Sequence, residues 1–155
     1  MSSAPVSAPT NRAMLLVFRA GAALAALPVE HVLETMRPLG TTPVASAPPY
    51  VLGAAVVRGA AVPVIDLARL LVGESAPVER WVTLRAGTRT VALAVGEVLG
   101  IRRAGTDHAP TLVGGVATSV LDGLGVLDRD LLVVLASARV MSEGAWKAFD
   151  EARVS

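Results

Sequence analysis

Two histidines are the side chains that could act as neutral general bases in this sequence. Neither His31 nor His108 has the neighbouring carboxylate and nucleophile that a catalytic triad requires. A metal site is not indicated either, because the chain has no cysteine and no His-x-x-x-His or Asp-x-Asp spacing. The glycine pairs at 114–115 and 123–125 lack the lysine of a phosphate loop and the helix of a dinucleotide site. The sequence therefore predicts neither an enzyme nor a cofactor, and it places His31 on an exposed segment.

Composition and charge narrow the class of protein further. The 155 residues carry a net charge of +1 with both signs interspersed, which is not the pattern of a nucleic-acid-binding protein. Hydrophobic residues make up 53% of the chain, but the longest uncharged stretch, 38–57, holds four prolines and cannot form a membrane-spanning helix. Residues 1–10 are mainly Ser, Ala and Pro and have neither the basic start nor the apolar core of a signal peptide. We expect a cytoplasmic protein without membrane insertion, and a disordered leader over 1–12.

The sequence contains an internal repeat. The segment from Arg19 to Glu34 recurs from Arg85 to Gly100, and half of the aligned positions are identical. A second similarity, in the same order, relates 52–69 to 121–139. Agreement in order and spacing across two segments predicts a duplicated architecture.

The elements of each half are mainly strands. Apolar residues alternate with polar ones or form short continuous runs between turns that contain glycine. Two short helices are predicted, one with Asp66 as its N-cap and one over 142–153, which begins at Ser142 and presses Trp146 and Phe149 onto the body. Strands are expected at 14–18, 24–29, 50–57, 61–65, 82–85, 91–95 and 131–135.

These elements predict a mainly β fold with two small barrels of about five strands each. We place both in a single domain over 13–153, with barrel one at about 13–73, barrel two at about 80–141 and the C-terminal helix at about 142–153.

The segment from Tyr50 to Leu67, YVLGAAVVRGAAVPVIDL, resembles the signature of CheW-like domains. The similarity continues at 27–34, at 123–127 and in the C-terminal helix, so that it spans about 13–151. The resemblance implies two interlocked barrels of SH3 type. It also implies a stand-alone, non-catalytic adaptor, with a groove between the barrels for the tip of a chemoreceptor coiled coil. The barrel edges would dock on the regulatory domain of a CheA-type histidine kinase.

The same resemblance matches Arg58 and Glu34 to a pair of residues that form a bidentate ion pair at the edge of that groove. A lone arginine in a hairpin turn would otherwise be an exposed surface residue. The repeat favours a functional role, because the counterparts of Glu34 and Arg58 are Gly100 and Asp128, so the pair occurs once.

Other positions are assigned by the resemblance alone. Val32 and Thr35, with the Val32 counterpart Val98, fall where the family places groove residues. Kinase contacts are implied near Tyr50 and Gly53.

Some of these positions have other interpretations or depart from the family. Gly53 and Gly59 also suit a close strand approach and a turn with positive φ. Val32 has an equally good interpretation as a core residue. Thr35 departs from a larger branched apolar residue, and Gly96 departs from an acidic one.

The sequence is compatible with three functions. The first is an adaptor that couples chemoreceptors to a CheA-type kinase. The second is a CheW-like protein of a non-flagellar or receptor-independent pathway, which the departures at Thr35 and Gly96 permit. The third is a small ligand-binding or hydrolytic β-barrel protein with a pocket between its halves. Exposed barrel edges also make ring formation with kinase domains plausible.

Overall fold

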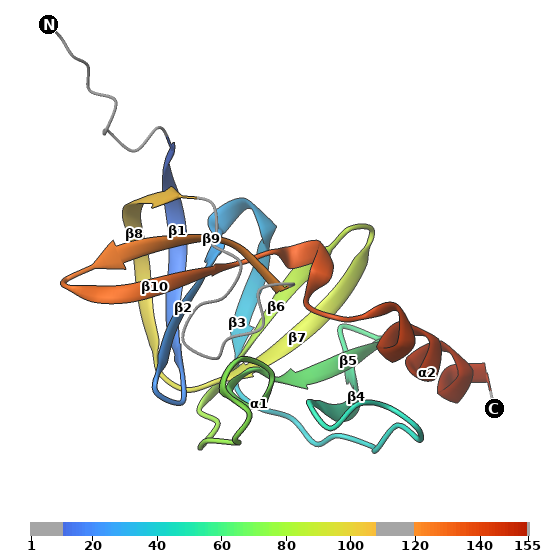
Figure 1. Ribbon diagram of the computed structural model, residues 1–155. Coiled ribbons are helices and arrows are strands. Elements are labelled where there is room, and N and C mark those ends of the chain that lie inside the picture. Colours follow the sequence, from blue (N-terminus) through green and yellow to red (C-terminus); the bar gives the residue numbers. More distant parts are fainter. Residues whose placement is uncertain (1–10, 108–119, 155) are drawn as a thin grey trace, which may run out of the picture.

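The computed structural model describes residues 11–107 and 120–154, and the described part contains ten strands in two sheets (Figure 1). The predicted leader at 1–10 and His108 lie outside the described residues, whereas Asn11 and Arg12, which were assigned to the leader, belong to the first strand. The strands are β1 (Asn11–Ala20), β2 (Ala23–Pro28), β3 (Val32–Met36), β4 (Val51–Val57), β5 (Ala60–Asp66), β6 (Arg80–Ala86), β7 (Arg89–Val95), β8 (Val98–Asp107), β9 (Leu121–Leu127) and β10 (Asp130–Leu135).

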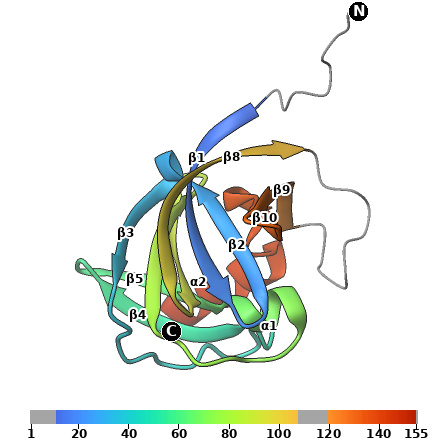
Figure 2. The same ribbon diagram turned by 90° about the vertical axis from the view of Figure 1, so that its left-hand side faces the viewer.

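The predicted fold class is confirmed, with a difference in how the two sheets close. Strands β1, β2, β10, β9 and β8 form a closed barrel, which Figure 2 shows from its side. Strands β3, β6, β7, β5 and β4 form the second sheet, which we call the open barrel. Among the described residues its two outer strands are not paired with each other, and a single bridge between Thr42 and Ala54 links β4 to the chain that follows β3.

The strand pairing does not follow the expected division of the chain into 13–73 and 80–141. The β1–β2 hairpin pairs with strands from the second half of the sequence, and the β6–β7 hairpin pairs with strands from the first half. Each barrel therefore combines a hairpin from one repeat with three strands from the other. This exchange ties the halves together through two parallel pairings, β10 with β2 and β5 with β7, and two antiparallel ones, β1 with β8 and β3 with β6.

The repeat seen in the sequence is also visible in the pairing. Both barrels have the same order of strands, with β8, β1, β2, β10 and β9 equivalent to β3, β6, β7, β5 and β4. The registers agree as well, because Val134 lies opposite Ala26 in one barrel and Val64 lies opposite Ala92 in the other.

Within residues 11–107 and 120–154, three hydrophobic clusters stabilise this arrangement. One lies between the barrels and includes Phe18, Leu27, Leu84, Leu93 and Phe149. The second lies inside the closed barrel and includes Leu15, Val17, Leu24, Ala26, Leu132 and Val134. The third lies inside the open barrel and consists of Ala55, Val57, Val62, Val64, Trp81, Ala92 and Ala94.

Both predicted helices are present, and their predicted caps are confirmed. Helix α1 (Leu67–Val72) begins after Asp66, whose Oδ1 accepts a hydrogen bond of 3.2 Å from the amide of Arg69. Helix α2 (Glu143–Val154) begins after Ser142, whose Oγ accepts a hydrogen bond of 3.1 Å from the amide of Ala145. In the described part of the chain, no helix is long and apolar enough to cross a membrane.

The Asp66 cap supports a testable difference in stability. Asp66 is buried, and its second carboxylate oxygen accepts a hydrogen bond of 2.6 Å from the Ser75 hydroxyl. We expect Asp66→Ala to lower the free energy of unfolding by about 1–2 kcal/mol, because the helix loses its cap and a hydroxyl loses its acceptor. Ser75→Ala should cost less, because the cap remains. Urea denaturation of both variants checks this, and equal losses would contradict it.

The position of His31 differs from the prediction. The sequence predicts an exposed segment, but His31 is half-buried in a 3-10 turn, η1 (Val29–His31). Its Nδ1 lies 2.8 Å from the Oγ of buried Ser137, at the start of a second 3-10 turn, η3 (Ser137–Arg139). These turns follow β2 and β10, which are neighbours in the closed barrel, and this topology brings two distant segments together.

Candidate functional site

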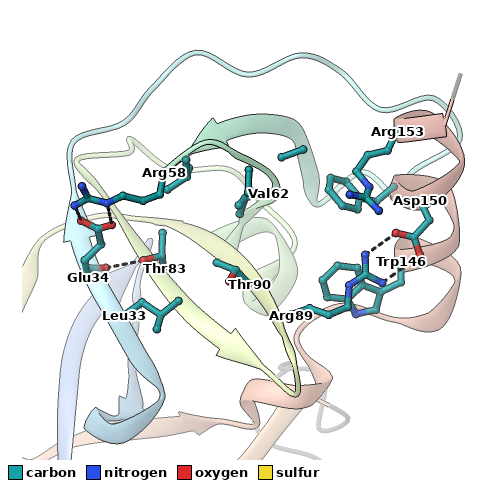
Figure 3. Close-up of a pocket in the computed structure, with 14 residues that line it drawn as sticks. Leu33, Glu34, Arg58, Val62, Thr83, Arg89, Thr90, Trp146, Asp150 and Arg153 are labelled. Atoms are coloured by element: carbon teal, nitrogen blue, oxygen red, sulfur yellow. Dashed lines mark hydrogen bonds and ion pairs between the residues drawn. The ribbon is translucent and has the colours of Figure 1, made fainter.

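The predicted ion pair between Glu34 and Arg58 is present, on the open barrel. Glu34 lies on β3, and Arg58 lies in the turn between β4 and β5. The Arg58 guanidinium donates two hydrogen bonds to the carboxylate, from Nε to Oε2 at 2.9 Å and from Nη2 to Oε1 at 2.7 Å (Figure 3). The Arg58 side chain is 79% exposed and that of Glu34 is 28% exposed. The pair therefore presents a fixed, bidentate arrangement of charges at the surface.

Local backbone geometry explains why these two side chains meet. Arg58 and Gly59 both have positive φ, 54° and 80°, which is typical of a tight two-residue turn between antiparallel strands. Glu34 follows a register shift in the pairing of β3 with β6, after which it lies opposite Thr83. The Thr83 hydroxyl donates a hydrogen bond of 3.3 Å to the Glu34 carbonyl oxygen and holds this part of β3 in place.

The ion pair lowers the pKa of the Glu34 carboxyl. Hydrogen bonding to the Arg58 guanidinium holds the pKa of the Glu34 carboxyl below its usual range, and this effect outweighs desolvation, which raises it. Glu34 is therefore ionised throughout the physiological pH range.

The lowered pKa of Glu34 predicts a pH dependence with a definite sign. Because the folded-state value is below the unfolded value of about 4.3, the pair stabilises the fold above that pH, and its contribution is lost as the pH falls through the folded-state pKa. We expect the carboxyl carbon of Glu34 to titrate in NMR at a lower pH than an unfolded glutamate, and at a higher pH in Arg58→Ala than in the wild type. The same midpoint in both proteins would contradict this.

The pair stands on the lip of a cavity of about 600 Å³, which we call the mouth of the open barrel. Strands and turns of the open barrel form its floor and one side, and α2 forms the opposite side (Figure 3). The lining residues are Leu33, Glu34, Val57, Arg58, Ala60, Ala61, Val62, Thr83, Arg89, Thr90, Trp146, Phe149, Asp150 and Arg153.

A second ion pair on the α2 side of the mouth was not foreseen from the sequence. Arg89, at the start of β7, donates from Nη1 and Nη2 to the Asp150 carboxylate at 3.1 and 2.5 Å. Its guanidinium carbon also lies 3.8 Å from the centroid of the Trp146 ring. These contacts hold α2 against the start of β7. The hydrogen bonds from Arg89 also lower the pKa of the Asp150 carboxyl.

The residues assigned to the receptor groove occupy two places. Glu34 and Arg58 lie at the mouth of the open barrel. Val32 and Val98 are half-buried and pack against the cluster between the barrels, so a core role is present for both. Thr35 is exposed on β3 and does not line the mouth.

A residue that no sequence argument singled out for this site joins Glu34 and Arg58. Leu33 lines the mouth and is 48% exposed. It lies at the register shift in β3, where the regular alternation of strand side chains is interrupted.

The residues assigned to the kinase interface lie at the other end of β4. Tyr50 is half-buried, and its hydroxyl donates to the Oγ of Ser142 and accepts from the Ser142 amide, both at 3.3 Å. It borders a second depression, of about 510 Å³, beside the start of α2. Gly53 has a φ of 150°, and a Cβ there would overlap the carbonyl oxygen of Thr42. The backbone interpretation of Gly53 is therefore confirmed.

Comparison with known proteins gives consistent results. Residues 14–145 match the CheW-like domain family. Protein FrzA of Myxococcus xanthus is 34% identical over 106 residues, and the aligned region spans 66% of this chain and 66% of that protein. The crystal structure of the scaffolding protein TtCheW from Thermoanaerobacter tengcongensis has the same fold. It superposes with a TM-score of 0.73 at 18% identity, over 81% of this chain and 90% of that one.

Proposed function

Because the chain belongs to the CheW-like domain family, and is accordingly a non-catalytic scaffold of chemotaxis-like signalling, we propose that it couples chemoreceptors to a CheA-type histidine kinase in the cytoplasm. The adaptor carries out no chemistry of its own. It holds a receptor tip and the regulatory domain of the kinase at a fixed distance, so that movement in the receptor reaches the kinase.

The observation that carries this proposal is the Glu34–Arg58 pair. It is exposed, it is held in one bidentate geometry, and it occurs in one of two barrels with the same strand order. The closed barrel has Gly100 where the open barrel has Glu34, because Gly100 lies opposite Val17 and Glu34 lies opposite the equivalent Thr83. It has Asp128 where the open barrel has Arg58, and both residues have a positive φ. The fold of the repeat therefore does not require the pair, which favours recognition of a partner.

The positions of the two assigned surfaces also support simultaneous binding of two partners. Arg58 follows the last residue of β4, and Tyr50 precedes its first residue. An extended chain of this length separates them by about 25 Å. This separation favours binding of a receptor helix at one end of β4 and of a kinase domain at the other.

Titration of the purified full chain tests the proposal. A cytoplasmic fragment of a chemoreceptor and the regulatory domain of a CheA-type kinase are each added, and binding is followed by calorimetry. Binding of both supports coupling. Binding of the kinase domain alone would contradict receptor coupling and favour a receptor-independent pathway. Binding of neither would overturn the proposal and favour a ligand-binding barrel.

A further inference from the structure

The two barrels have equivalent interiors in backbone but not in chemistry. In the closed barrel, Val17 and Leu24 point inward and are buried in its apolar cluster. Thr83 and Thr90 occupy the equivalent positions of the open barrel. Thr83 corresponds to Val17, because each lies opposite the equivalent strand, at Glu34 and Gly100. Thr90 corresponds to Leu24, because each lies opposite the equivalent arginine, Arg85 and Arg19. Apolar side chains that fill one barrel are thus replaced by hydroxyls in the other.

The consequence of this replacement is an unfilled space. Thr83 has nearly the same size as its equivalent Val17, whereas Thr90 is smaller than its equivalent Leu24 and leaves space in the mouth, whose volume is about 600 Å³. Cavities of about 300–1,000 Å³ at the mouths of barrels, with an apolar lining and a few polar groups, are the usual form of small-molecule sites. Val57 and Val62 supply apolar surface here, together with the exposed side of Leu33.

The charges of the mouth are unbalanced. Among the described residues that line it, three are arginines and two are acids. Arg58 and Arg89 are each held by a carboxylate through two hydrogen bonds. The third guanidinium, that of Arg153, lies 5.6 Å from the Phe149 ring centroid and is close enough to Asp150 to help lower the pKa of that carboxyl. The lining as a whole therefore carries one excess positive charge.

We propose that the mouth of the open barrel binds a small organic carboxylate with an apolar body. The apolar body lies against Leu33, Val57 and Val62, and the carboxylate accepts hydrogen bonds from the Arg153 guanidinium. The Thr90 hydroxyl lines the same space and supplies a further donor. The site is separate from the assigned kinase surface and adjoins the Glu34–Arg58 lip, so occupancy would place a ligand next to the proposed receptor contact.

The experiment is an NMR titration of the isotope-labelled full chain with hexanoate and phenylacetate, each paired with its uncharged amide. We expect saturable shifts of the Leu33 and Val62 methyl groups for the acids, and about tenfold weaker binding for the amides. Arg153→Gln should weaken acid binding by about tenfold and leave amide binding unchanged. Arg80→Gln, an exposed arginine outside the mouth, is the matched control and should bind like the wild type.

A second variant tests the origin of the cavity. Thr90→Leu installs the residue of the equivalent position in the closed barrel and should abolish binding of both acids while the spectrum remains that of a folded protein. Equal affinity for acid and amide, full binding by Arg153→Gln, or no saturable shift with either acid would overturn the proposal. Neither receptor nor kinase is present in this assay, so its failure leaves the coupling function untouched.

Discussion

Replacement of Arg58 by alanine is expected to weaken binding of the receptor fragment by about tenfold or more, while the protein remains folded. The variant removes both hydrogen bonds to Glu34 and leaves that carboxylate without its fixed partner on the lip of the mouth. The melting temperature should stay close to that of the wild type, because an exposed ion pair contributes little to stability. Calorimetric titration and thermal unfolding of the same preparation measure the two quantities.

The closed barrel provides a matched control for this variant. Arg129 is also an exposed arginine with positive φ, and it lies in the equivalent hairpin turn between β9 and β10. Arg129→Ala should bind the receptor fragment like the wild type. Equal losses in Arg58→Ala and Arg129→Ala would indicate a general electrostatic effect and contradict the assignment of the lip. Unchanged binding by Arg58→Ala would contradict it as well.

Replacement of Gly53 by alanine is expected to lower the free energy of unfolding by about 3 kcal/mol. Gly53 has a φ of 150°, and an added Cβ would overlap the carbonyl oxygen of Thr42. That oxygen accepts a hydrogen bond of 2.8 Å from the Ala54 amide, in the bridge that joins β4 to the chain after β3. The substitution must therefore displace the bridge. Urea denaturation measures the loss.

Gly59→Ala separates the effect of crowding from that of backbone conformation. Gly59 also has a positive φ, 80°, but nothing lies within 4 Å of an added Cβ. Its substitution should cost only about 1–2 kcal/mol. A loss at Gly53 no larger than that at Gly59 would show that the close approach to Thr42 is not a constraint. If Gly53→Ala instead weakened kinase binding at unchanged stability, the interface interpretation would be favoured.

Much of the fold follows from local patterns in the sequence, but the pairing of the strands does not. Turns such as Ala20-Gly21 and Arg58-Gly59, between apolar runs, identify the hairpins correctly, and Asp66 and Ser142 identify the helix starts. No local pattern of this kind supports the expected division of the chain into two barrels at 74–79, and each barrel in fact combines strands from both halves. In a duplicated sequence the β1–β2 and β6–β7 hairpins have equivalent strand edges, so no local pattern tells which set of three strands each hairpin completes.

The candidate site, too, could be predicted only in part from the sequence. The resemblance to CheW-like domains predicted the Glu34–Arg58 pair, which the structure contains. The contribution of Leu33 could not be predicted from strand alternation, because it depends on a register shift between Val32 and Glu34. The pairing of Arg89 with Asp150 joins residues that are 61 positions apart, on a strand and a helix whose relative placement is set by the tertiary fold. The two residues form no motif of fixed spacing, so the sequence alone does not predict that they pair.

The most direct test of the account is a co-sedimentation of three components. Chemoreceptor fragments anchored on vesicles are mixed with a CheA-type kinase, with and without the full chain, and the kinase in the pellet is measured. We predict that the kinase sediments with the vesicles when the wild-type chain or Arg129→Ala is present and stays in solution when the chain is omitted. With Arg58→Ala, much less kinase should sediment than with the wild type. Kinase in the pellet to the same extent without the chain, or none with the wild-type chain, would contradict the coupling function.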